Sequence, residues 1–183
     1  MAKRIGRHTL LLTCSPSVIG YAAVGARKEK QGPLVDYFDL LSEDSSFGEK
    51  TWEQAETLMQ KKAVELALQK SSLKKDDIDF LFAGDLLNQC ISSAYASREM
   101  QIPFFGLYGA CSTMSESLSL ASLFVEAGLA QHCVAATSSH FCSAERQFRF
   151  PLEYGGQRTP TSQWTVTGSG ACVVAAKRQA PYV

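Results

Sequence analysis

The stretch from residue 104 to residue 128 constrains the fold most, because it joins an expected strand to an expected helix through a tight turn. Its sequence is FFGLYGACSTMSESLSLASLFVEAG. The apolar run 104–108 has the length and composition of a buried strand, and the Gly-Ala pair after it predicts a turn. Cys111 lies where the helix begins, and unpaired backbone N–H groups there favour a thiolate over a thiol. Cys111 is therefore a candidate nucleophile, with a small buried apolar residue as the alternative.

The helix expected after Cys111 has an unusual composition. Between Thr113 and Ala127 it carries small or apolar residues on nearly every side, and only Glu116 and Glu126 are charged. A helix without a broad polar face is typically buried on several sides. The alternative is an ordinary helix whose serines face solvent.

Strand-like and helix-like segments alternate along the rest of the chain. Apolar runs predict strands at 8–14, 80–83, 104–108, 132–137 and 171–176. The sequence TWEQ at 51–54 has the form of a capping box, which predicts that a helix starts there, and 91–100 predicts another helix. Such alternation is typical of an α/β fold with a parallel sheet and right-handed crossovers.

Three segments interrupt this alternation. Proline and glycine punctuate 15–25, which is expected to form a loop. The stretch 33–48 is expected to be a surface segment with some turns of helix, because aspartate and serine favour caps and turns. Residues 141–167 are rich in aromatic residues and arginine and continue neither pattern.

Polar residues follow several of the predicted strands, at the edge where open α/β sheets bind ligands. These residues are Asp85, Asn88, Cys111, Ser138, Ser139 and His140. We expect the turns that carry them to face one crevice.

Charge and cysteine content exclude several classes of function. Eighteen basic and eighteen acidic residues give zero formal charge, so no overall field attracts nucleic acid or anionic lipid, and only a local patch could do so. The apolar run near the N-terminus is too short for a signal peptide core or a transmembrane segment. The six cysteines include no CxxC pair and no zinc-site spacing, so we expect reduced thiols and no bound metal.

Several of these segments resemble the thiolase-fold superfamily. The similarity lies in residues 84–89, in the turn into Cys111 with its serine-rich helix, and in the strand that ends at His140. Cys111 matches the nucleophilic cysteine of thiolases and of beta-ketoacyl-acyl-carrier-protein synthase III. Residues 168–174 resemble the GDGAGAVV segment of the latter, with Ser169 where an acidic residue is usual. The resemblance implies a βαβαβαβ half of a thiolase-like fold, with a mixed, mainly parallel sheet and a buried central helix.

Within this superfamily the chain is most similar to the stage V sporulation protein AD family. The specific segments are FRFPLEYGGQRTP at 148–160 and WTVTG at 164–168. The resemblance implies a soluble component of the complex that moves dipicolinic acid (pyridine-2,6-dicarboxylate) with calcium into the developing spore. It also implies a peripheral position at the cytoplasmic face of the spore inner membrane, and a homodimer paired through 104–108. Residues 1–183 would form the N-terminal half of such a protein, with the second half absent from this chain.

Two functions remain open from the sequence. As a binding protein, the chain would hold dipicolinic acid through Cys111, Asp85, Asn88, Ser138, Ser139, His140 and Arg149, with calcium as a possible companion of the ligand and no other cofactor. As an acyltransferase or beta-ketoacyl synthase, it would use Cys111 as the catalytic nucleophile. Arg146, Arg149 and Arg158 could each pair with a carboxylate, or could lie in a solvated loop.

Overall fold

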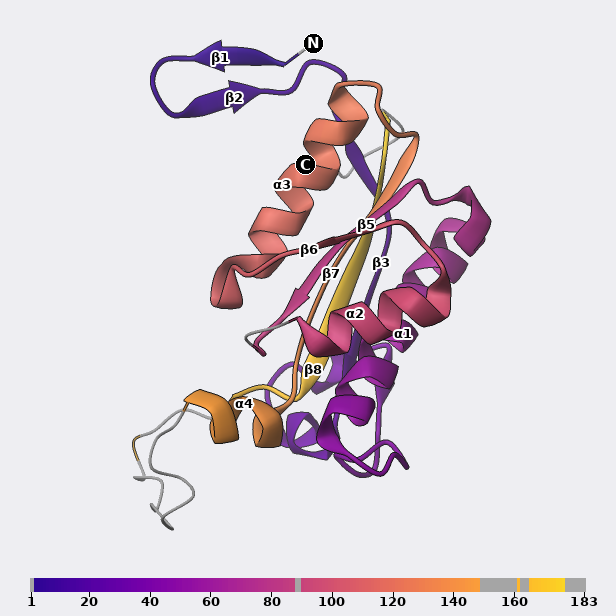
Figure 1. The fold of residues 1–183 in the computed structure, drawn as a ribbon, viewed down its shortest axis with the longest axis vertical. Coiled ribbons are helices and arrows are strands. Elements are labelled where there is room, and N and C mark those ends of the chain that lie inside the picture. Colours follow the sequence, from indigo (N-terminus) through magenta and orange to yellow (C-terminus); the bar gives the residue numbers. More distant parts are fainter. Residues whose placement is uncertain (1, 88–89, 149–160, 162–164, 177–183) are drawn as a thin grey trace.

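The computed structural model describes residues 2–87, 90–148, 161 and 165–176 (Figure 1). Within these residues the strands are β1 (Lys3–Ile5), β2 (Thr9–Leu11), β3 (Ser17–Gly25), β4 (Leu40–Leu41), β5 (Phe80–Asp85), β6 (Phe104–Gly106), β7 (His132–Ser139) and β8 (Gly168–Ala175). The α-helices are α1 (Trp52–Ser71), α2 (Ile91–Met100), α3 (Thr113–Glu126) and α4 (Phe141–Phe148). Short 3-10 helices are η1 (Arg27–Gln31), η2 (Val35–Tyr37), η3 (Lys75–Asp77) and η4 (Ala110–Ser112).

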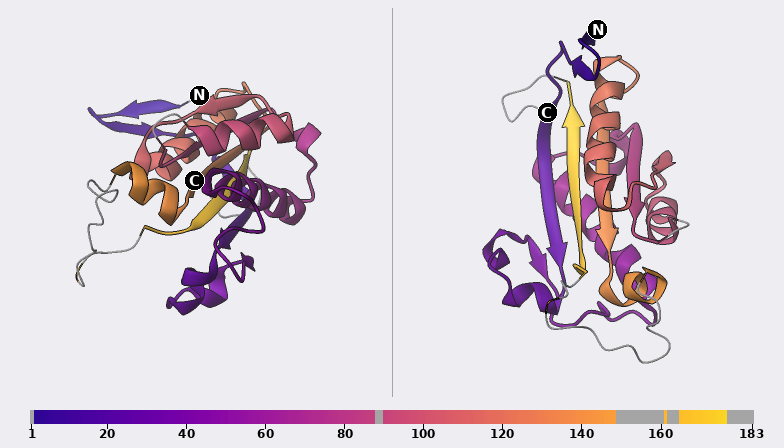
Figure 2. Two further views of the ribbon diagram at one scale, coloured as in Figure 1. Left: turned by 60° about the horizontal axis from the view of Figure 1, so that its bottom comes forward. Right: turned by 90° about the vertical axis from the view of Figure 1, so that its left-hand side faces the viewer.

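Six strands form one mixed sheet in the order β4-β3-β8-β7-β5-β6. Strand β8 runs antiparallel to both β3 and β7, whereas the other neighbouring pairs are parallel. Helices α1 and α2 cover one face of the sheet and α3 covers the other (Figures 1 and 2). The expected α/β class and the mixed, mainly parallel sheet are therefore confirmed.

Strand β3 shows that the loop expected at 15–25 is wrong. Its glycines permit close packing instead of making turns. A Cβ atom at Gly20 would lie 2.4 Å from the carbonyl oxygen of Ala67 in α1, and one at Gly25 would lie 2.8 Å from the ring of Phe38. Because glycine has no side chain, α1 packs directly on this strand at Gly20 and the segment before β4 packs directly on it at Gly25.

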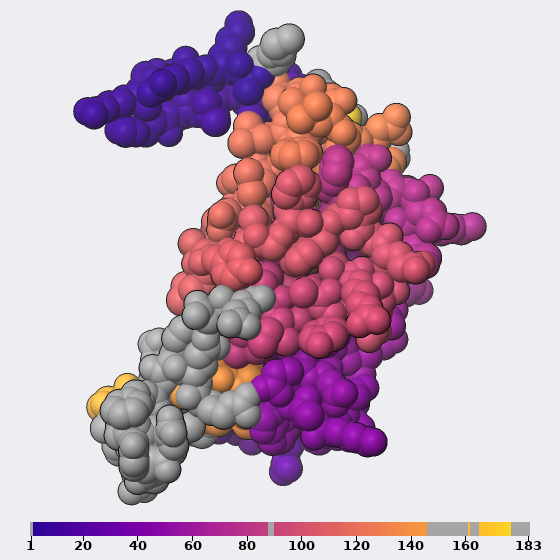
Figure 3. Space-filling view, viewed as in Figure 1, coloured from indigo at the N-terminus to yellow at the C-terminus, as the bar shows by residue number. Residues whose placement is uncertain are grey.

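The strand expected at 8–14 is present only as β2, and it does not join the sheet. It pairs antiparallel with β1 in a separate hairpin, which projects from the body of the protein (Figure 3). All six positions of these two strands are exposed, so the leucines of this apolar run stay outside the core. A second departure is α4, which lies inside the segment where the sequence indicated no regular element.

Helix α1 begins where the capping box predicted. The hydroxyl oxygen of Thr51 accepts a hydrogen bond from the backbone N–H of Gln54 at 3.2 Å. Ala55, Met59 and Ala63 recur at intervals of four along α1, and all three are fully buried against the sheet. Within the described residues, no helix combines the length and the apolarity needed to cross a bilayer.

Helix α3 packs on the other face of the sheet through aromatic rings. The ring centroid of Phe82 lies 4.9 Å from that of Phe124 and 5.0 Å from that of Phe105. The opposite side of α3 remains exposed in this chain, and it includes Ser115 and Ser119. The helix is thus buried on the side of Ser117 and Ser122, and it is open on the side of Ser115 and Ser119.

Because of the close contact at Gly20, alanine substitution there should destabilise the protein more than alanine substitution at Gly170 in the neighbouring strand. Gly20→Ala should lower the free energy of unfolding by about 1–3 kcal/mol, because the new methyl group overlaps the backbone of α1. Gly170→Ala in β8 is the matched control, since nothing lies within 4 Å of its added Cβ, and it should change stability by less than about 0.5 kcal/mol. Urea unfolding followed by circular dichroism measures both, and equal effects would contradict this account of β3.

Candidate functional site

Cys111 lies in η4, the short turn that connects the β6 segment to α3. Of the six cysteines, all of which lie within the described residues, Cys111 alone is exposed. The residue before it, Ala110, has φ 47°, in the left-handed region that residues other than glycine rarely adopt. Such strain costs on the order of 1–3 kcal/mol and is concentrated at functional sites. The turn thus holds Cys111 in an exposed position at the start of a helix.

The close approach of β5 positions this turn. A Cβ atom at Gly84 would lie 2.2 Å from the carbonyl oxygen of Leu107 and 2.8 Å from the side chain of Thr113. The backbone N–H of Leu107 also donates to the carbonyl oxygen of Ala83 at 2.9 Å. Glycine at position 84 therefore lets the chain on both sides of Cys111 lie directly against the end of β5.

Cys111 opens onto a pocket of about 340 Å³ at the ends of β3, β7 and β8. Its described lining consists of Ala23, Phe38, Leu86, Ala110, Cys111, Met114, Thr137, Ser138, Ser139, Val166, Gly168, Ser169 and Gly170. This described lining includes no Asp, Glu, Lys or Arg side chain. The structure thus brings Cys111, Ser138 and Ser139 to one pocket, as expected for turns at one edge of the sheet.

Alternation along β7 gives its serines different roles. Val134 and Ala136 contribute to the core beneath α1, so Ser138 points toward α1 while Thr137 and Ser139 point to the opposite face. The hydroxyl of Ser139 donates to the carbonyl oxygen of Val166. Ser138 contributes to the pocket wall, but its hydroxyl serves another group.

That group is Glu56, a fully buried carboxyl on α1. Its Oε1 accepts a hydrogen bond from Ser138 at 3.0 Å, and its Oε2 accepts one from Ser143 of α4 at 3.2 Å. Burial, and to a smaller extent the charge of Asp85, raise the pKa of Glu56 to about 7. Glu56 is not among the site residues expected from the sequence, although Glu56 and Gln60 form a polar i, i+4 pair beside the buried positions of α1.

Asp85 belongs to the same buried region and does not face the Cys111 pocket. Its carboxylate accepts hydrogen bonds from the backbone N–H groups of Leu87 at 2.9 Å and Ser93 at 2.8 Å. Burial raises the pKa of Asp85, whereas these hydrogen bonds act in the opposite direction. Asp85 thus fixes the start of α2 to the end of β5.

His140 is also turned away from Cys111. Its ring is fully buried and stacks on Trp52, with centroids 5.0 Å apart. Its Nε2 lies 2.8 Å from the carbonyl oxygen of Ser45, and its Nδ1 accepts from the backbone N–H of Cys142 at 3.1 Å. This pattern fixes the neutral tautomer with the proton on Nε2, and burial lowers the pKa of His140. Both ring nitrogens are therefore engaged, Nε2 with the segment around Ser45 and Nδ1 with the start of α4.

The other residues that the sequence indicated as candidates are not among the described residues that line this pocket. Asn88, Arg149 and Arg158 lie outside the described residues. Arg146 lies within α4.

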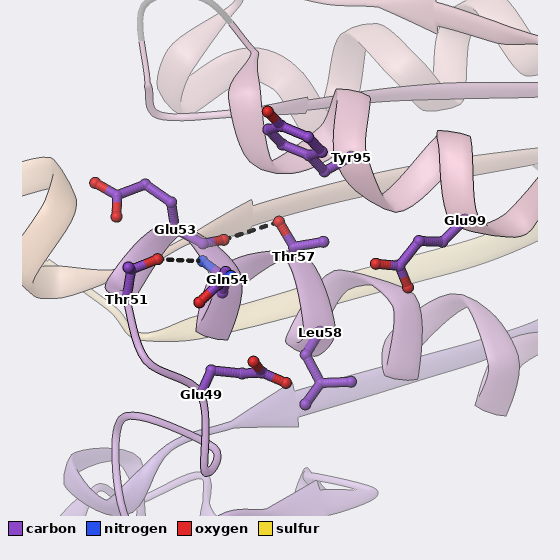
Figure 4. Close-up of a pocket in the computed structure, with 8 residues that line it drawn as sticks. All are labelled: Glu49, Thr51, Glu53, Gln54, Thr57, Leu58, Tyr95 and Glu99. Carbon is purple, nitrogen blue, oxygen red and sulfur yellow. Dashed lines mark hydrogen bonds between the residues drawn. The ribbon is translucent and has the colours of Figure 1, made fainter.

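Another pocket, of about 430 Å³, lies between α2 and the N-terminal part of α1 (Figure 4). Its lining includes Glu49, Glu53 and Glu99 together with Tyr95. Glu99 is paired with Lys61 at 2.8 Å, whereas the surrounding carboxylates repel an anion. Of these two pockets, the one at Cys111 is the better candidate for an anionic ligand.

Comparison with known proteins identifies both a family and a fold. The sequence model described as stage V sporulation protein AD (SpoVAD) matches residues 6–183. Stage V sporulation protein AD of Bacillus subtilis (strain 168) is 46% identical over 172 residues, which cover 94% of this chain and 51% of that protein. The chain thus spans about half the length of this relative.

Solved structures with a similar fold include a 3-oxoacyl synthase, OleA and a beta-ketosynthase. The 3-oxoacyl-[acyl-carrier-protein] synthase III of Aquifex aeolicus has a TM-score of 0.61 and 16% identity, covering 90% of this chain and 55% of that chain. Xanthomonas campestris OleA with bound lauric acid and lauroyl-CoA has a TM-score of 0.60 and 14% identity, covering 91% and 57%. The priming beta-ketosynthase of the R1128 polyketide pathway has a TM-score of 0.57 and 18% identity, covering 88% and 50%. At these identities the likeness shows the thiolase-like fold alone.

The buried Glu56 predicts a specific dependence of stability on pH. Its pKa is about 7 in the folded protein against an ordinary value of 4.5, so the unfolded chain loses this proton first as pH rises. The contribution of Glu56 to the free energy of unfolding is therefore largest below about pH 4.5, and it falls by up to about 3 kcal/mol by pH 7. Glu56→Gln should abolish this part of the pH dependence, as urea unfolding between pH 4.5 and pH 8 would show.

Glu65→Gln, on the exposed side of α1, is the matched control and should retain the pH dependence of the unmodified protein. If the free energies of Glu56→Gln and the unmodified protein stay parallel across this range, the buried carboxyl does not carry the proton assigned to it.

Proposed function

The chain belongs to the stage V sporulation protein AD family, and from this premise we propose that it binds dipicolinic acid during sporulation. The proposed site is the Cys111 pocket. The ligand is a planar aromatic ring with two carboxylates, so its site needs flat apolar walls and groups that favour negative charge.

The observation that supports this proposal most is the chemistry of the pocket lining. Phe38, Met114 and Leu86 supply apolar surface, and Thr137 adds a hydroxyl on the same face of the sheet. The positive end of the α3 dipole lies at Cys111, where a carboxylate is favoured. The described lining contains no Asp or Glu side chain, so nothing in it opposes a dianion.

The charge of the ligand still needs a counter-charge. We assign this role to Arg149, through a bidentate pair with one carboxylate, and to calcium that arrives with the ligand as cargo. We give Asp85 a supporting role in this scheme, because both of its carboxylate oxygens already accept backbone hydrogen bonds. His140 likewise supports the site by anchoring the neighbouring segment.

Acyl transfer by Cys111 is the alternative function. Its exposed thiol at a helix start, on a fold shared with beta-ketoacyl synthases, favours this reading. The chemistry also needs a base near the thiol and an oxyanion hole. No histidine is among the described residues that line the pocket, and both nitrogens of His140 are engaged elsewhere. We therefore favour binding over catalysis.

The proposed assembly is a homodimer attached peripherally to the spore inner membrane, together with other subunits of the dipicolinic acid transport complex. Strand β6 forms an edge of the sheet, and the side chain of Phe105 on it is 43% exposed. Pairing of β6 with its copy across a twofold axis would give hydrogen-bond partners to the unpaired backbone groups of this edge strand. Light scattering should show a dimer at micromolar concentration, and a monomer would contradict this pairing.

Calorimetric titration of the full-length protein tests the proposed ligand. Dipicolinate should bind at least about tenfold more tightly than benzoate, because benzoate lacks the second carboxylate. Thr137→Val should weaken dipicolinate binding, since it replaces a pocket hydroxyl by a methyl group of similar size. Ser119→Ala, on the exposed side of α3, is the control and should bind as the unmodified protein does.

Equal and millimolar affinities for dipicolinate and benzoate would contradict a dedicated site. Incubation with acetyl-CoA, followed by mass spectrometry, addresses the alternative. An acyl adduct on Cys111, with turnover that disappears in Cys111→Ala, would make acyl transfer the primary function.

A further inference from the structure

The hairpin of β1 and β2 exposes apolar side chains away from the body of the protein (Figure 3). Ile5, Leu10 and Leu11 are 52%, 55% and 48% exposed. A two-stranded hairpin is at best marginally stable in water unless another surface packs against it. The structure therefore presents an apolar surface that is suited to a further contact.

The base of this hairpin is held firmly in place. The Thr13 hydroxyl donates to one carboxylate oxygen of Glu126 at 2.8 Å, and the backbone N–H of Cys14 donates to the other at 2.7 Å. A hydrogen bond with the Cys14 side chain, together with these two, lowers the pKa of Glu126, so its carboxylate stays ionised. Because Glu126 is the last residue of α3, the hairpin projects from a fixed point at the end of that helix.

The charge of this region points to an anionic partner. Residues 1–28 contain no Asp or Glu, whereas the hairpin carries Lys3, Arg4 and Arg7. The strand register places Lys3 opposite Leu11 and Arg4 opposite Leu10. Each face of the hairpin thus combines a cation with an apolar side chain, the pairing that anchors peripheral proteins at the interface of a bilayer.

We propose that the β1–β2 hairpin is the element with which this protein contacts an anionic lipid surface. Its leucine and isoleucine side chains enter the headgroup region, while Lys3, Arg4 and Arg7 lie among the lipid phosphates. Each cation at such a surface strengthens binding by roughly fivefold, and the effect weakens as salt rises. The inference rests on the membrane position in the proposed function, but it does not depend on the ligand of the Cys111 pocket.

Sedimentation of the full-length protein with vesicles tests this inference. The vesicles contain phosphatidylcholine alone or with about 30% phosphatidylglycerol, the anionic lipid in this assay. Binding should require phosphatidylglycerol, should fall at least about tenfold in the Lys3→Glu, Arg4→Glu, Arg7→Glu variant, and should also fall when Leu10 and Leu11 are both replaced by serine. Reversal of three exposed lysines elsewhere, Lys50, Lys74 and Lys75, is the matched control and should leave most of the binding intact.

Three outcomes would overturn the inference. The first is that the unmodified protein binds neither kind of vesicle, and the second is that the hairpin variants and the control variant bind vesicles equally. The third is that a hairpin variant fails to fold while the unmodified protein binds no better to vesicles with phosphatidylglycerol than to those without it. The last result would show that the hairpin packs within the full-length protein. Dipicolinate titration of the same preparations separates this question from the proposed function, because hairpin variants that lose vesicle binding should retain the affinity of the unmodified protein for dipicolinate.

Discussion

The contact between Gly84 and the chain around Cys111 is the constraint on which the candidate site depends. An added side chain at Gly84 would overlap the backbone at Leu107 and the side chain of Thr113. Because Gly84 has no side chain, the β6 segment, η4 and the start of α3 all lie against the end of β5. The strained Ala110 then directs Cys111 over the ends of β7 and β8. The position of the thiol is thus a consequence of backbone packing, not of hydrogen bonds to its own side chain.

Consecutive residues of β7 reach two different polar environments, one on each face of the sheet. Thr137 and Ser139 face the open pocket, whereas Ser138 between them donates to the buried Glu56. The Glu56 carboxyl also accepts from Ser143, so it links α1, β7 and α4 behind the pocket wall. This arrangement supports the site from the far side of the sheet without placing a charge in the pocket.

The sequence predicted those parts of the fold in which local pattern and tertiary role agree. The capping box at Thr51 and the buried strands β5, β7 and β8 are of this kind. Strand β6 is shorter than the buried strand expected at 104–108, and it is mostly exposed because it lies at the edge of the sheet. Strand β3 was missed because Gly20 and Gly25 resemble turn signals, and only their contacts with distant segments explain them. The meeting of Cys111 with Ser139 follows from the rule that ligands bind at strand ends. That rule does not say which face of the sheet a side chain takes, so it could not separate Ser138 from Ser139 or place His140.

We predict that one pocket contains both the exposed thiol of Cys111 and the ligand. Peptide-resolved alkylation of the full-length protein by iodoacetamide, with and without dipicolinate, measures this most directly. Cys111 should react faster than the buried Cys90 and Cys133, and dipicolinate should slow its reaction while leaving theirs unchanged. Rapid labelling of Cys111 that is indifferent to saturating dipicolinate would place the ligand elsewhere and contradict the account.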